Sequence, residues 1–103
     1  MEAFVQRMVE EHAQLVTRVQ SLNDYVYSDA SDKDNKVEFA NKCIQLAAMK
    51  KYEEALRARL ENQNVVYTDG TYFEKVGKIT QQVVQNSNPN KKEDIDFEGK
   101  DGK

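Results

Sequence analysis

The sequence has little of the residue types on which most chemistry in proteins depends. Its single cysteine, Cys43, excludes an intramolecular disulfide and a zinc cluster built from cysteines. Its four glycines form no phosphate-binding loop and no dinucleotide-binding fingerprint. Its single histidine, His12, has no residue one helical turn away that could complete a catalytic or metal-binding group. We therefore expect no enzyme, no metal site and no cofactor.

Long apolar runs and an excess of basic charge are also missing. No run approaches 18 apolar residues, so we expect no membrane span, and the N-terminus lacks the apolar core of a secretory signal. Fifteen basic residues against 18 acidic ones give a net charge of −3. Since no segment forms a polybasic arm, binding to nucleic acid or to an anionic membrane is not expected. The length of 103 residues predicts one small domain, which we assign to residues 1–86.

A heptad pattern marks the first quarter of the chain. Seven residues step by three and four positions along one face of a helix predicted over residues 2–27: Val5, Met8, His12, Leu15, Val19, Leu22 and Val26. The place of His12 in this series favours a histidine in the core or at an interface. Because one helix cannot bury such a face alone, a partner helix is required, and we expect a homo-oligomer with coiled-coil packing.

A second helix is predicted over residues 36–62. The turn-forming residues 28–35 separate it from the first helix, and either Asn35, with Glu38 three positions later, or Asp34 can serve as its N-cap. Glu53 and Arg57 are expected as an ion pair on its solvent-facing side. Its apolar stripe comprises Phe39, Cys43, Leu46, Met49, Tyr52, Leu56 and Leu60. Because the link is short, we predict a mainly α fold built on an antiparallel αα-hairpin.

The last third of the chain is predicted to be less regular. Two β-prone runs over about residues 65–73 flank Asp69-Gly70, which is typical of a type I′ β-hairpin with Tyr67 opposite Tyr72. Without a surface to lie on, this segment would be an ordered loop. Apolar residues at helical spacing predict a short third helix over about residues 74–86. Residues 87–103 are mostly polar and are expected to form a disordered tail of mixed charge.

Aromatic and basic side chains provide the candidate binding surface. The aromatic residues could form a recognition patch, or they could pack the hairpin onto the helices. The basic residues of the second helix could contact phosphates where two chains converge, or they could form a solvated face. The candidates are Tyr25, Tyr27, Lys50, Arg57, Arg59, Tyr67, Tyr72 and Phe73. In an antiparallel hairpin, we expect the two tyrosines of the first helix to lie far from the aromatic residues after the second.

Two stretches of the sequence carry a family resemblance. The first reads Phe4-x-x-Arg7-Met8-x-x-Glu11-x-x-x-Leu15-x-x-Arg18. The second reads Met49-x-x-Tyr52-x-x-x-Leu56-x-x-Arg59. Together they cover about residues 1–62, which resemble short helix–loop–helix accessory proteins of tailed bacteriophages, including crAss-like phages. Residues 63–103 have no counterpart in this pattern.

The resemblance implies a small phage protein in the cytoplasm of a bacterial host. Accessory proteins of this kind often act against host immunity, and the expectation is a non-enzymatic inhibitor of a host defence component. Two alternatives stay open, namely an oligomeric sponge for an immune nucleotide messenger and a structural or assembly adaptor. The resemblance assigns no functional residues, and the partner is either a host defence protein or a small nucleotide.

Overall fold

The computed structural model describes residues 1–84. Two long helices, α1 (Ala3–Val26) and α2 (Lys36–Asn62), run antiparallel and are joined by a connector that contains a short 3₁₀ helix, η1 (Asp29–Lys33). Three strands follow, β1 (Val65–Thr68), β2 (Thr71–Val76) and β3 (Ile79–Gln82), in an antiparallel sheet of order β1-β2-β3. The fold is thus the predicted αα-hairpin with a small sheet after it, whereas the predicted tail over residues 87–103 lies outside the described residues.

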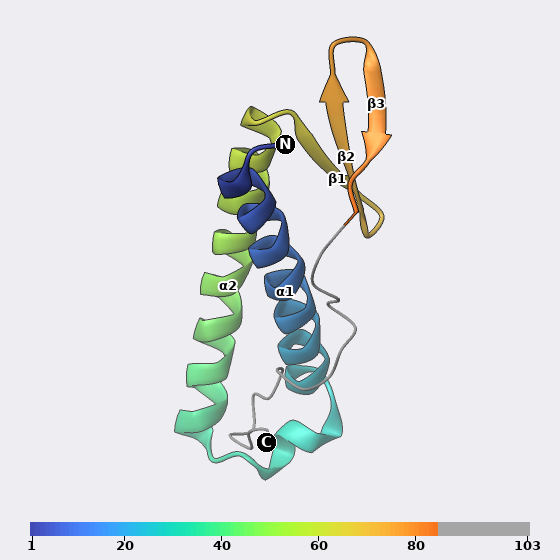
Figure 1. Cartoon of the computed structure of the whole chain (residues 1–103). Coiled ribbons are helices and arrows are strands. Elements are labelled where there is room, and N and C mark those ends of the chain that lie inside the picture. Colours follow the sequence, from blue (N-terminus) through green and yellow to red (C-terminus); the bar gives the residue numbers. More distant parts are fainter. Residues whose placement is uncertain (85–103) are drawn as a thin grey trace.

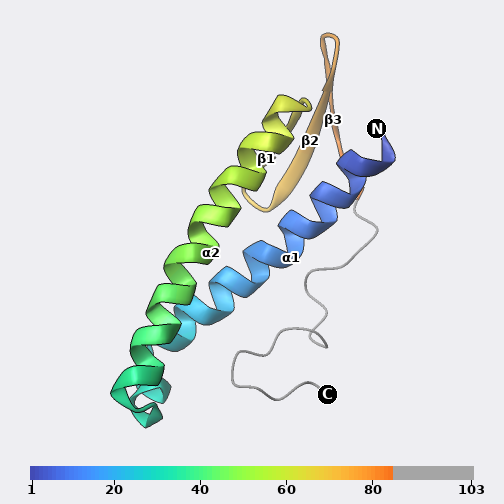
Figure 2. The same cartoon turned by 90° about the vertical axis from the view of Figure 1, so that its left-hand side faces the viewer.

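The sheet lies at the end of the hairpin that is remote from the connector. Figure 1 shows it beside the beginning of α1 and the end of α2, and Figure 2 shows the two helices diverging toward that end. We call this the open end of the hairpin. Within residues 1–84, no helix combines the length and the apolar character that crossing a membrane requires.

The heptad face of α1 is buried as the sequence predicts. Six of its seven residues are buried, and Val19 packs partly buried against the same core. The partner helix that this face requires is α2 of the same chain, with Leu46 facing Leu22 and Val26 near the connector. At the open end, the core comprises Val5, Met8, Val9, Ala13, Leu15, Leu56, Leu60, Val65 and Tyr72.

The N-terminus of α2 is capped as the pattern indicates. The side chain of Asn35 accepts a hydrogen bond from the backbone N–H of Glu38, with a nitrogen–oxygen distance of 2.7 Å. In the preceding connector, the Ser28 side chain accepts from the backbone N–H of Ala30, and the buried Ser31 hydroxyl donates to the carbonyl of Val26. These local bonds satisfy backbone groups at the helix ends and fix the reversal of the chain.

Replacing Asn35 by alanine is expected to lower the free energy of unfolding by about 1 kcal/mol, because the Glu38 N–H loses its acceptor. Urea denaturation followed by circular dichroism measures this change. Asn41→Ala, at an exposed position inside α2, is the matched control and should leave the stability unchanged or slightly raised. An equal loss in both variants would contradict the capping role.

The buried face of α2 is narrower than the predicted stripe. Leu46, Leu56 and Leu60 are buried, whereas Phe39 is 36% exposed and Tyr52 is 45% exposed. Those two positions lie at the margins of the face that meets α1, and a helix packed on one side buries only a narrow set of residues. The sequence pattern overestimated the width of the stripe because apolar residues also lie at its margins.

The predicted β-hairpin is confirmed together with its register. Tyr67 pairs with Tyr72 and Thr68 pairs with Thr71 across the turn. Asp69 and Gly70 both have positive φ, of 50° and 81°, which is the backbone conformation of a type I′ turn. The surface that the hairpin needs is the open end of the helices, where Val65 and Tyr72 join the core.

The third helix predicted over about residues 74–86 is wrong. Residues 74–76 belong to β2, and β3 pairs with β2 across a two-residue turn at Gly77 and Lys78. Gly77 has φ of 62°, which suits the first central position of a tight hairpin turn. The β-branched side chains of this segment favour a strand, and an existing edge on β2 gives that strand a partner.

Candidate functional site

A hydrogen-bonded network of four side chains, two of them buried and two partly exposed, joins both helices to the sheet. His12 of α1 is completely buried. Its Nδ1 lies 2.6 Å from the hydroxyl oxygen of Tyr72 on β2, and its Nε2 lies 2.8 Å from Oε2 of Glu53 on α2. Arg57, one turn further along α2, donates to both carboxylate oxygens of Glu53. We call these four residues the enclosed network.

The partners of His12 determine which of its nitrogens carries the proton. An ionised carboxylate only accepts hydrogen bonds, so the proton lies on Nε2 and is donated to Glu53. The unprotonated Nδ1 then accepts from the hydroxyl of Tyr72. The ring of Tyr67 completes the enclosure, with its centroid 4.8 Å from the imidazole centroid in an edge-on arrangement. Neutral His12 therefore has both nitrogens occupied.

Burial sets the ionisation of this network. Removal from water lowers the pKa of His12 below its ordinary value and outweighs the opposing effect of Glu53. Burial alone would raise the pKa of Glu53, but the hydrogen bonds from His12 and Arg57 hold it below its usual range. Burial also raises the pKa of the Tyr72 hydroxyl, so this group stays protonated. The resulting state is a neutral histidine beside a carboxylate that is paired with a guanidinium.

The enclosed network has the components of a proton relay but not the access that a catalyst needs. A carboxylate, a histidine and a hydroxyl in line are the groups of a nucleophilic triad. Here the hydroxyl belongs to Tyr72, which is 1% exposed, so its oxygen meets protein and not solvent. The contacts of this network instead attach β2 to α1 and α2, which is a structural role.

The sequence pattern placed His12 correctly in the core but missed its main partner. The expected ion pair of Glu53 with Arg57 is confirmed. Its expected place on the solvent-facing side of α2 is wrong for Glu53, because the Glu53 carboxylate reaches the buried His12. Glu53 follows Met49 and precedes Leu56, so it lies on the buried face. That spacing indicates a buried carboxylate, but the sequence does not show which other element supplies its partner.

A pocket opens beside the first turns of α1 and the last turns of α2. It has a volume of about 310 Å³ and is lined by Phe4, Met8, Ala58, Arg59, Asn62 and Gln63. We call it the open-end pocket. Its wall combines an aromatic ring that is 41% exposed, a thioether, a guanidinium and two amides. These groups can stack, pair with an anion and form hydrogen bonds, but none of them is a nucleophile or a general base at neutral pH.

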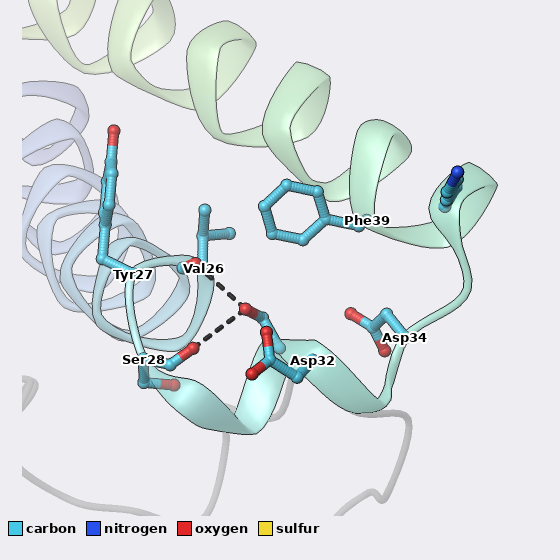
Figure 3. A pocket seen from close by; sticks show the side chains of 8 residues that line it. Val26, Tyr27, Ser28, Asp32, Asp34 and Phe39 are labelled. Atoms are coloured by element: carbon cyan, nitrogen blue, oxygen red, sulfur yellow. Dashed lines mark hydrogen bonds between the residues drawn. The ribbon is translucent and has the colours of Figure 1, made fainter.

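A second pocket lies at the connector (Figure 3). Its volume is about 530 Å³, and its wall comprises Val26, Tyr27, Ser28, Ser31, Asp32, Asp34, Lys36 and Phe39. We call it the connector pocket. Asp34 is already occupied, because its Oδ2 lies 3.1 Å from the ammonium of Lys42. The remaining charges, on Asp32 and Lys36, are of opposite sign, so this wall has no preference for a charged ligand.

The aromatic candidates from the sequence divide into two groups, as predicted. Tyr25 and Tyr27 lie at the connector, while Tyr67, Tyr72 and Phe73 lie on the sheet at the open end. Tyr25 holds the connector, since its hydroxyl lies 3.2 Å from Oδ1 of Asp34. Tyr27 is 78% exposed and lines the connector pocket. Tyr67 and Tyr72 pack around His12, so the five residues do not form one surface.

The basic candidates are also separated. Arg57 is engaged by Glu53 in the enclosed network. Lys50 is exposed on α2, seven residues before Arg57. Arg59 is the basic side chain that lines the open-end pocket. Within residues 1–84, no three histidine, cysteine, aspartate or glutamate side chains gather closely enough to hold a metal ion.

The fold and its pockets define a class of protein: a small αα-hairpin whose solvent-accessible pockets are lined by groups suited to binding. The chain belongs to the Sequestin family, whose model matches residues 2–62. The match spans α1, the connector and α2, and it ends before the sheet. No curated protein and no solved structure matches the chain. The family name points to sequestration, which is a binding role.

Proposed function

We propose that this protein works by sequestration, withholding a component of a bacterial host's immune defence during phage infection. Membership of the Sequestin family supports a role in which the protein binds its target without transforming it. The phage resemblance of residues 1–62 supports the setting, which is the host cytoplasm. Sequestration requires affinity and abundance, and it requires no reactive group in contact with the ligand.

The observation that carries this proposal is the division between the interior and the surface at the open end. The histidine, the carboxylate and the tyrosine that could do chemistry are joined to one another inside the enclosed network. The open-end pocket, a short distance along the same helices, presents groups that bind without reacting. A site with this division can hold a ligand but has no group positioned to change it.

Expression of the protein in bacteria that carry single defence systems tests this proposal. We expect at least one system in a broad panel to lose its protection, measured as an increased efficiency of phage plating. Phe4→Ala combined with Arg59→Ala should abolish the effect, because both side chains line the open-end pocket. Lys51→Ala, at an exposed position of α2, should retain the effect on phage plating. Unchanged protection across the panel would contradict the proposal.

A second candidate is more specific, and the lining of the open-end pocket favours it. A nucleotide messenger offers a flat base and a phosphate. The ring of Phe4 can stack on the base, the guanidinium of Arg59 can bind phosphate oxygens in pairs, and the amides of Asn62 and Gln63 can bind the edge of the base. The pocket volume of about 310 Å³ lies at the lower end of the range for small-molecule sites.

Calorimetry with a panel of cyclic and linear nucleotides tests this candidate. We expect heat with a fixed stoichiometry for at least one nucleotide. Arg59→Ala should weaken binding about tenfold or more, since a hydrogen bond to a charged group contributes roughly 1.5–3 kcal/mol. Lys51→Ala should bind like the original chain. Flat titrations would exclude a nucleotide and leave a defence protein as the target, while abundance in purified virions would favour a structural adaptor.

A further inference from the structure

The outer edge of β3 is a strand edge without the usual protection against pairing. β3 is the last strand of the sheet, and all four of its residues are exposed. Natural edge strands are commonly guarded by charged side chains, proline or bulges. The segment from Ile79 to Val84 reads Ile-Thr-Gln-Gln-Val-Val, which contains no charge and no proline. Half of these residues are β-branched and apolar, a composition that favours strand pairing.

The register with β2 determines which backbone groups face outward. The backbone N–H of Val83 donates to the carbonyl of Tyr72 at 2.8 Å. Because inward and outward groups alternate along an antiparallel strand, residues 79, 81 and 83 bond to β2, and residues 80 and 82 direct their N–H and C=O groups away from it. The part of the chain that the structure describes provides no strand on that outer side.

We propose that the β3 edge pairs antiparallel with the β3 edge of a second copy of this chain, about a two-fold axis through Gln81. In this register, Thr80 of each chain lies opposite Gln82 of the other, so the outward backbone groups meet as hydrogen-bonded pairs. The two sheets then become one continuous sheet of six strands. This inference concerns an assembly surface and is independent of the proposed ligand.

The side chains of β3 are complementary to themselves in this register. Ile79 of one chain lies opposite Val83 of the other, which makes an apolar β-branched pair on each side of the axis. These two pairs lie on the same face of the sheet as Tyr72. Val83 is bonded to Tyr72 on the neighbouring strand, so their side chains share a face, and Ile79 lies four positions before Val83 on that same face. Lys78, the basic residue in the adjoining turn, lies at opposite ends of the paired strands and meets no like charge.

The size of the contact sets its strength. The five paired residues of each chain, 79–83, make a contact well below the area of a stable protein interface, so the dimer should be weak and dependent on concentration. A covalent trap is therefore a better test than a mass measurement alone. The two Gln81 residues that meet on the axis, one from each chain, form a pair without mutual hydrogen bonds. Their Cα atoms are roughly 4.5 Å apart, a distance that a disulfide between cysteines at this position can bridge.

Disulfide trapping tests whether the two-fold axis of the dimer passes through Gln81. Gln81→Cys in a Cys43→Ala background should form a disulfide-linked dimer under mild oxidation. The matched control is Lys75→Cys in the same background, which places an exposed thiol on the central strand β2, away from the axis. We expect the Gln81 variant to cross-link at least several-fold faster. Equal rates in the two variants would overturn the proposal.

A charge exchange tests the register by a second route. Gln81→Lys and Gln81→Glu each place like charges opposite one another on the axis, so sedimentation should show neither variant forming the dimer. An equimolar mixture of the two should form it again, because opposite charges then meet. Failure of the mixture to associate, with both variants folded by circular dichroism, would overturn the register through Gln81 even if another surface joins copies of the chain.

Discussion

Replacing His12 by alanine is expected to lower the free energy of unfolding by about 2–5 kcal/mol. Removal of the imidazole leaves a cavity at a position that is 0% exposed. It also leaves the Tyr72 hydroxyl without its acceptor and the Glu53 carboxylate without one of its donors. For a domain of this size, such a loss is a large fraction of the total stability. Urea denaturation at neutral pH measures it.

The control for this change is Gln20→Ala, at an exposed position on the same helix. It should alter the stability by no more than about 0.5 kcal/mol. The His12 variant should also loosen the sheet more than the helices, because the lost bonds attach β2 to α1 and α2. Hydrogen exchange of the β2 amides reports this, and unchanged exchange there would contradict the structural role of the enclosed network.

Acidification below pH 6.5 is expected to destabilise the protein. Burial holds the pKa of His12 below 6.5, so at mildly acidic pH the unfolded chain takes up a proton that the folded chain excludes. Stability is therefore unaffected well above pH 6.5 and falls as the pH drops from 6.5 toward the lower pKa of the folded state. The steepest slope for one proton is about 1.4 kcal/mol per pH unit. Thermal or urea denaturation across this range measures it.

Four other charged or titratable side chains surround His12. Glu53 and Arg57 face it from α2, and Tyr67 and Tyr72 face it from β1 and β2. The depressed pKa of Glu53 adds a second loss below about 4.5, where the unfolded carboxylate is protonated first. His12→Leu should remove the slope just below pH 6.5, whereas Glu11→Gln on the exposed side of α1 should retain it. A slope unchanged in the leucine variant would assign the effect to another group.

The function and the candidate binding residues could be predicted only in part from the sequence. The absence of catalytic motifs predicted a binding role, and the family name agrees with such a role. Of the eight candidate residues, Arg59 lines the open-end pocket and Tyr27 lines the connector pocket. The other residues of the open-end pocket come from the beginning of α1 and from the end of α2. The sequence pattern of either helix alone does not predict that these residues meet. Pocket walls are made by packing, which has no periodic signal in the sequence.

The sequence by itself determined the helices and the first turn of the sheet. The heptad face of α1, the Asn35 cap and the Asp69-Gly70 turn each depend on residues within a few positions of one another. Local hydrogen bonds and side-chain periodicity encode such features directly, so they could be located without coordinates.

Only the tertiary structure decided the third strand and the partners of His12. The segment after Val76 has both helical spacing and β-branched residues, and the edge of β2 selected the strand. The bonds from His12 to Glu53 and to Tyr72 span 41 and 60 positions along the chain. At such separations, the contact depends on how α1, α2 and the sheet pack together, because the conformations of single elements do not contain that information.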